Sequence, residues 1–79
     1  MNAKPPPTYG EKLVGLDFYP SGDPKVKQLK TLFAEIIDIC SDELTDLQEE
    51  NSASPIWREA IMRSLDAQMW TVKAATWKG

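Results

Sequence analysis

Residues 23–50 read DPKVKQLKTLFAEIIDICSDELTDLQEE, and this stretch predicts a long amphipathic helix. Asp23 can cap the helix, and Pro24 suits its first position because the missing N–H would have no partner there. Apolar residues then recur in steps of three and four, which keeps them on one stripe. They are Val26, Leu29, Phe33, Ile36, Ile37, Cys40, Leu44 and Leu47. We expect one helix over about residues 24–50.

A second start signal follows in Ser54, as N-cap, and Pro55, as first helical residue. It predicts a second helix over about residues 55–77. Apolar residues form two rows on this helix: Trp57, Ile61, Leu65, Met69 and Val72 on one side, and Ala60, Ala67, Trp70, Ala74 and Trp77 on the adjoining side. The short connection makes the two helices antiparallel neighbours. The sequence therefore predicts an all-α fold, an antiparallel two-helix hairpin within a domain of residues 11–79.

The first ten residues have a different composition. Pro5, Pro6 and Pro7 favour an extended conformation, and the segment offers little apolar surface for packing. We expect residues 1–10 to form a mobile, extended N-terminal arm. Residues 11–17 are too short and mixed to assign, and Gly15 weakens both a helix and a strand.

A chain of 79 residues needs help to stay folded, because so small a domain buries little of its surface. With one cysteine and no histidine, neither an internal disulfide nor the usual zinc site can be assembled, and no cofactor is expected. The second helix is apolar around more of its circumference than one partner helix can cover. We therefore expect a homo-oligomer.

The chain has a formal net charge of -3, and the charge is unevenly distributed. Residues 1–31 sum to +2, residues 32–53 to -7 and residues 54–79 to +2. An antiparallel hairpin turns this pattern into a basic and an acidic pole, with Arg58 and Arg63 facing the carboxylates across the hairpin. The net negative charge argues against general DNA binding. The lone cysteine, with no signal-peptide pattern or long apolar run, indicates a soluble cytoplasmic protein that does not bind membranes.

A candidate ligand site surrounds the start of the first helix, where residues 17–30 read DFYPSGDPKVKQLK. Three lysines, including Lys27 and Lys30, oppose the helix dipole, which favours anions at this end. The turn at Ser21 and Gly22 lets a phosphate approach the backbone, and Phe18 or Tyr19 could stack on a base. These features predict a nucleotide site. Alternatively, an aromatic residue packs on the helix as a hydrophobic staple and the lysines form a solvated face.

Nothing in the sequence indicates catalysis. Without histidine there is no imidazole base, and no carboxylate pair lies in an apolar context that would raise a pKa. Cys40 lies in the apolar stripe, so we interpret it as a buried structural thiol. The run from Asp42 to Glu50 lacks the glycine and alternating ligands of a calcium loop. We expect a binding protein with no metal site, not an enzyme.

Two longer stretches resemble a known family. FYPSGDPKVKQLKTLFAEIID (Phe18 to Asp38) and LDAQMWTVKAATW (Leu65 to Trp77) are similar to the small helical-hairpin proteins of the phage anti-CBASS/anti-Thoeris sponge family. The similarity covers about three-quarters of the chain. It implies a homohexamer in the host bacterial cytoplasm that binds cyclic oligonucleotide second messengers of immunity without cleaving them.

The resemblance also implies residue roles. Phe18 or Tyr19 would stack on a base, and Lys30, with Lys27 beside it, would meet phosphate or base. Lys73 and Thr76 are the nearest matches to a second pocket, for cyclic trinucleotides. The implied partners are cyclic dinucleotides, and possible further ones are cyclic trinucleotides or cyclic ADP-ribose-type signals. The alternative function is a helical homo-oligomeric interaction or phage structural module that acts through its acidic surface.

Overall fold

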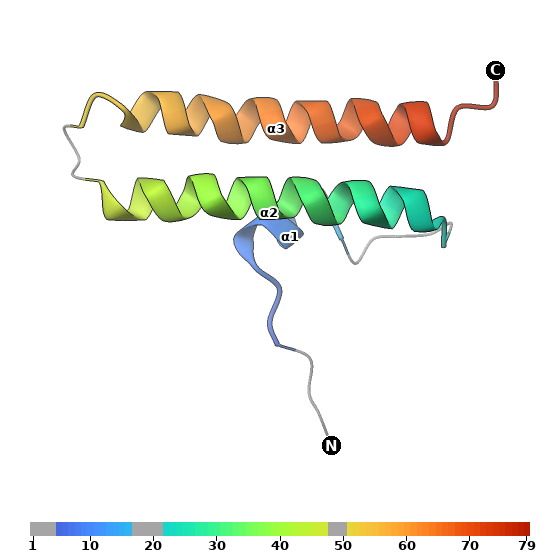
Figure 1. The fold of residues 1–79 in the computed structure, drawn as a ribbon, viewed down its shortest axis with the longest axis horizontal. Helices are drawn as coiled ribbons and strands as arrows, with labels where there is room; N and C mark the ends of the chain where they lie inside the picture. The colour runs from blue at the N-terminus through green and yellow to red at the C-terminus, as the bar shows by residue number, and fades with distance from the viewer. Residues whose placement is uncertain (1–4, 17–21, 48–50) are drawn as a thin grey trace.

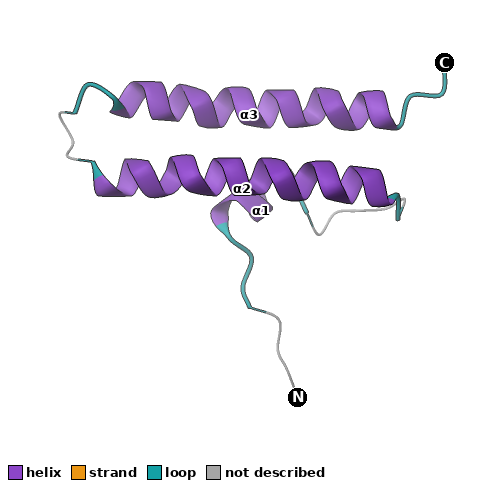
Figure 2. Ribbon diagram, viewed as in Figure 1, coloured by secondary structure: helices purple, strands orange, loops and turns teal. Residues whose placement is uncertain are grey.

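The computed structural model describes residues 5–16, 22–47 and 51–79. Over these residues the chain forms the helices α1 (Tyr9–Val14), α2 (Pro24–Asp46) and α3 (Ser54–Ala75) and no strand (Figures 1 and 2). The predicted all-α class is confirmed for this part of the chain. α3 lies along α2 and runs in the opposite direction, whereas the short α1 packs mainly on α2 (Figure 1). None of the described helices has the length and apolar character needed to cross a membrane.

α2 begins as the sequence predicts and ends early. The Asp23 carboxylate accepts a hydrogen bond from the Lys25 backbone N–H at 2.9 Å, and Pro24 occupies the first turn. The predicted end at about residue 50 is wrong, because Leu47 already has extended backbone angles, with φ -85° and ψ 149°. Residues 48–50 lie outside the described part of the chain.

α3 begins one residue before its predicted start, and the predicted N-cap is wrong. Ala53 is the capping residue, so Ser54 is the first residue of the helix and is buried. The side chain that orders this start is Asn51, whose Oδ1 accepts from the Ala53 N–H at 2.8 Å. At the other end, α3 stops at Ala75, two residues before the predicted end.

The N-terminal segment departs most from the prediction, because α1 begins inside the expected arm. The Thr8 hydroxyl accepts from the Glu11 N–H at 3.1 Å, and the Glu11 carboxylate accepts from the Thr8 N–H at 2.8 Å. This reciprocal pair is a capping box, and its Thr-x-x-Glu signature is present in the sequence. Gly15, with φ 66°, ends α1 in the left-handed conformation. Among the described residues, helical structure therefore begins at Tyr9, with Thr8 as its cap, inside the arm expected over residues 1–10.

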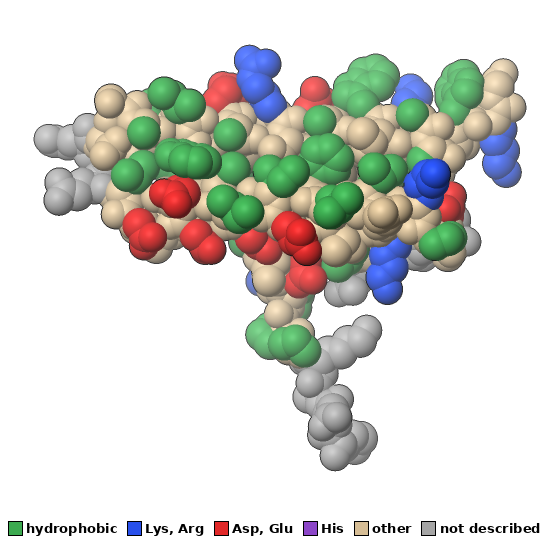
Figure 3. All heavy atoms as spheres, in the orientation of Figure 1, with side chains coloured by type: hydrophobic (Ala, Val, Ile, Leu, Met, Phe, Trp, Pro, Cys, Tyr) green, Lys and Arg blue, Asp and Glu red, His purple; other side chains and the backbone are tan. Residues whose placement is uncertain are grey.

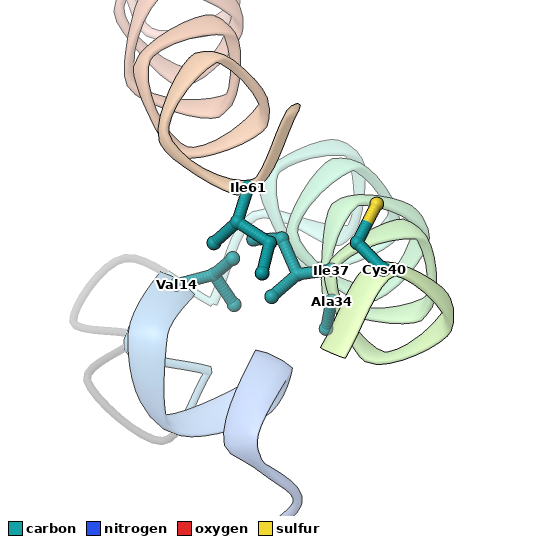
Figure 4. Close-up of a cluster of buried hydrophobic side chains, with 5 residues drawn as sticks. All are labelled: Val14, Ala34, Ile37, Cys40 and Ile61. Carbon is teal, nitrogen blue, oxygen red and sulfur yellow. The ribbon is translucent and has the colours of Figure 1, made fainter. Parts of the chain in front are cut away.

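The core forms where the three helices meet. Val14 of α1, Ile37 of α2 and Ile61 of α3 point toward one another (Figure 4). Ile37 is fully buried, and Ala34 and Cys40 of α2 complete the buried cluster. α1 therefore covers the junction between the two long helices on one side.

α1 is held to α2 by a close backbone approach at Gly10. The Gly10 N–H donates to Asp38 Oδ1 at 2.7 Å. Gly10 is buried, and a Cβ added to it would overlap the carbonyl oxygen of Ala34. A larger residue at position 10 would push α1 away from α2.

We expect Gly10→Ala to destabilise the protein, although alanine is the better helix former by about 1 kcal/mol. Overpacking against Ala34 should lower the free energy of unfolding by about 1–3 kcal/mol, measured by urea denaturation at fixed protein concentration. Gln28→Ala, at an exposed position of α2, is the control. A stabilised Gly10→Ala variant would show that α1 does not pack closely on α2.

Candidate functional site

The predicted site is described only in part. Phe18, Tyr19 and Ser21 lie outside the described residues. Gly22, beside them, is exposed and has φ 66°, which favours glycine. Among the described residues, no atom outside its chain neighbours lies within 4 Å of a Cβ built on it. Position 22 therefore favours glycine for its backbone conformation.

The two predicted lysines of α2 occupy different environments. Lys27 is exposed, and Lys30 is half-buried where α2 faces the end of α1. The Lys30 ammonium donates to the carbonyl oxygen of Gly15 at 3.3 Å. Lys30 therefore makes a side-chain hydrogen bond, whereas the Lys27 ammonium makes none with the described residues.

Lys73 and Thr76 lie at the end of α3. The Lys73 ammonium is 5.4 Å from the centroid of the Trp70 ring, a cation–π distance. Thr76 is exposed, and its hydroxyl donates to the carbonyl oxygen of Val72 at 2.8 Å. Both side chains are on the surface. The structure places neither of them in the pocket described below.

Charge separates along the molecule in the way the sequence predicts. The start of α2 and the end of α3 lie at the same end of the fold, and both carry lysines, whereas acidic side chains follow α2 toward the α2–α3 connection (Figures 1 and 3). The predicted pairing of Arg63 across the hairpin is wrong. Arg63 Nε lies 3.3 Å from Glu59 Oε2, one turn earlier in α3. This exposed pair contributes at most about 1 kcal/mol.

A pocket of about 390 Å³ opens between the end of α1 and the two long helices. Its walls are mainly apolar, and Lys30 and Gln68 are its polar members. The lining includes Leu13, Gly15, Lys30, Leu65, Gln68 and Val72. Of the predicted ligand-binding residues that the structure describes, Lys30 is the one that reaches this pocket.

Sequence reasoning missed Gln68. Its side chain is only 4% exposed, and its amide has no hydrogen-bond partner among the described residues. The signal was present, because Gln68 falls on the same side of α3 as Ile61, Leu65 and Val72. A polar residue within an apolar row is a departure that can mark a site.

Two other interpretations concern Cys40 and the acidic run. Cys40 is 5% exposed and packs in the core cluster, so its prediction as a buried thiol is confirmed. Asp42, Glu43 and Asp46 are exposed on α2. Among the described residues, no group of three or more metal-ligating side chains comes together.

Comparisons of the chain with protein families, curated proteins and solved structures find no match. The family resemblance therefore depends on the quoted motifs alone.

We expect Lys30→Met to destabilise the protein and Lys27→Met to leave it unchanged. Methionine keeps the chain length and the helix propensity of lysine, so the difference reports the loss of the Lys30 ammonium, whose contacts include the bond to Gly15. Its loss should lower the free energy of unfolding by about 0.5–1.5 kcal/mol, measured by urea denaturation. Equal stability of the two variants would show that the Lys30 contact does not hold α1.

Proposed function

We propose that this chain is a phage-encoded sponge that binds cyclic oligonucleotide second messengers and withholds them from a CBASS-type or Thoeris-type defence. The observation that carries this proposal is the gathering of lysines where α2 begins and α3 ends, in the two stretches that resemble the sponge family. We place the binding site at this basic end of the molecule. We propose that the protein acts in the host bacterial cytoplasm.

The start of α2 favours an anionic ligand. The Asp23 carboxylate caps the helix, but the first turn itself contains no acidic residue, and Lys25 and Lys27 are both exposed there. Cations at a helix N-terminus oppose the helix dipole, at a cost of roughly 0.3–1 kcal/mol each. A bound phosphate would remove this conflict, because it would pair with the lysines and with the positive end of the dipole.

Binding by sequestration suits the chemistry of the chain. A sponge needs affinity and copy number, and it needs no general base or nucleophile. The only cysteine is buried in the core, and the sequence has no histidine. We therefore propose binding without cleavage.

We further propose that the binding unit is a homo-oligomer, a hexamer by resemblance, built from the α2–α3 hairpin. Large apolar side chains remain exposed on both long helices and just after α3 (Figure 3). They are Leu32, Ile36, Ile39, Ile56, Met62, Met69, Trp70 and Trp77. Ile39 is 60% exposed and Trp70 is 63% exposed. So much exposed apolar surface on so small a chain favours burial against further copies.

The acidic surface supports a second candidate function. Asp42, Glu43 and Asp46 are exposed together on α2 and could dock a basic host protein. Such an interaction module would not respond to nucleotides. Its activity would be lost on neutralising these three carboxylates.

We expect cyclic dinucleotides to raise the thermal stability of the protein. A ligand at 100 times its dissociation constant adds about 2.7 kcal/mol to the free energy of unfolding. The measurement is a melting-temperature screen with cyclic di- and trinucleotides and cyclic ADP-ribose forms, followed by heat release and mass analysis of the ligand. Intact released ligand supports sequestration. A linearised product, or no shift with any compound, would contradict it.

Reversing charge at the basic end should weaken this binding. We expect Lys27→Glu with Lys73→Glu to lower affinity by at least about 10-fold, because both substitutions place a negative charge near the phosphates. The matched control is Arg58→Glu with Arg63→Glu, which changes the net charge equally at exposed positions nearer the α2–α3 connection. Isothermal titration calorimetry checks both. Equal effects of the two pairs would show that only net charge matters.

Assembly should depend on the exposed apolar stripe of α2. We expect Ile39→Asp to reduce the mass measured by light scattering during size-exclusion chromatography, because a buried unpaired carboxylate is costly at an interface. The isolated fold should survive, since Ile39 is exposed in the single chain. Thr45→Asp, at an exposed position on another side of α2, is the control. A monomeric wild-type protein would overturn the proposed oligomer.

A further inference from the structure

The contacts of the described residues do not explain why the amide of Gln68 is buried. Gln68 is only 4% exposed, and it lines the pocket between α1 and the long helices. The described residues supply no hydrogen bond to its carbonyl oxygen or its NH₂ group. A buried polar group without a partner is unfavourable, and such groups are rare in native proteins. A ligand with complementary donors and acceptors would account for it.

The size of the pocket limits that ligand. Small-molecule sites usually measure roughly 300–1,000 Å³, and this pocket of about 390 Å³ is near the lower bound. One base with its sugar suits such a volume. The remainder of a larger ligand would extend out through the open side of the pocket.

The walls indicate a flat apolar group. Leu13, Leu65 and Val72 line the pocket and offer only hydrocarbon surface. Lys30 is the cationic member of the lining, and its ammonium is positioned by the Gly15 carbonyl. A nucleobase has apolar faces, a polar edge and an attached anionic phosphate. It therefore matches the apolar walls, the amide and the lysine together.

The amide narrows the choice of base. A carboxamide presents one acceptor beside two donors, and adenine presents N6–H₂ beside the acceptor N7, so the two can form a bidentate pair. On the same edge guanine presents two acceptors, O6 and N7, one of which would face the amide oxygen, so a carboxamide that meets this edge favours adenine. The N1–H and O6 edge of guanine also matches a carboxamide, and the cyclic di-GMP measurement below tests that alternative. Pyrimidines offer a donor and an acceptor but a smaller apolar face.

We propose that this pocket holds an adenine base of the bound nucleotide, with the Gln68 amide reading its N6 and N7 edge. This inference rests on the proposed function, because it identifies which base of the cyclic messenger is recognised. It also assigns Gln68 as a specificity-determining residue. Lys30 contributes positive charge at the same pocket.

The test compares Gln68→Met with the control Gln28→Met, since Gln28 is exposed on α2. Methionine keeps the length of the side chain and removes both hydrogen-bonding groups. We expect Gln68→Met to weaken cyclic di-AMP binding by about 10-fold or more and to leave cyclic di-GMP binding unchanged. Its melting temperature without ligand should equal or exceed that of the wild type, because no internal hydrogen bond is lost. A fall of several degrees would assign the amide a structural role and overturn the inference.

A second arm separates this inference from the sponge itself. Adenosine monophosphate is titrated into the isotope-labelled protein, and the side-chain amide signal that disappears in Gln68→Met is followed by NMR. A shift of this signal with no binding of cyclic nucleotides would support the adenine pocket and contradict the sponge. Cyclic di-AMP binding that is equal in the wild type and in Gln68→Met would contradict the pocket alone. If neither nucleotide binds, both proposals are overturned.

Discussion

The fold depends on the close approach of α1 to α2. A helix of six residues is not stable by itself in water. α1 persists because Gly10 has no side chain, which lets its backbone lie against Ala34 and donate to the Asp38 carboxylate. Val14 then reaches the junction of the long helices and joins Ile37 and Ile61 in the core. Without this contact the two long helices would have only each other to bury their apolar stripes.

α1 also makes the two sides of α2 different. With 3.6 residues per turn, Leu32, Ile36 and Ile39 fall on the side of α2 opposite Ala34, where α1 packs. The covered side contains the core and the pocket. The opposite side keeps its apolar residues in solvent, so a single copy leaves much of its apolar surface unburied. α1 therefore forms one wall of the pocket and leaves uncovered the opposite side of α2, which we propose as the assembly surface.

Local signals in the sequence predicted the two long helices. The features that were not predicted depend on weak local signals or on tertiary contacts. Asp23 and Pro24 fix the start of α2 through contacts within its first turn, so a motif could identify it. The end of α2 and the cap of α3 depend on Leu47 and Asn51, which carry no strong signal. α1 has its capping box in the sequence, but a helix this short is stable only through its contact with Ala34, and that contact could not be inferred from the chain.

The candidate site also contains residues that the sequence predicted and a residue that it did not. Lys27 and Lys73 were predicted from charge pattern and resemblance, because charge at a helix end is visible in the sequence. Gln68 was missed, because a glutamine is ordinary on a helix surface and becomes informative only when its burial is known. Its amide and the ammonium of Lys30 line one pocket because α1 brings Gly15 to α2 beside α3.

Lys30 connects the stability of α1 to the pocket. Its bond to Gly15 holds the end of α1, and the same side chain lines the cavity that α1 helps to form. An ammonium has three N–H donors, so a bond to a carbonyl oxygen is compatible with a bond to a phosphate oxygen. Ligand binding at this lysine therefore does not require α1 to detach. Because α1 must be docked for the pocket to exist, a ligand held there would stabilise the docked form, and the two equilibria would reinforce each other.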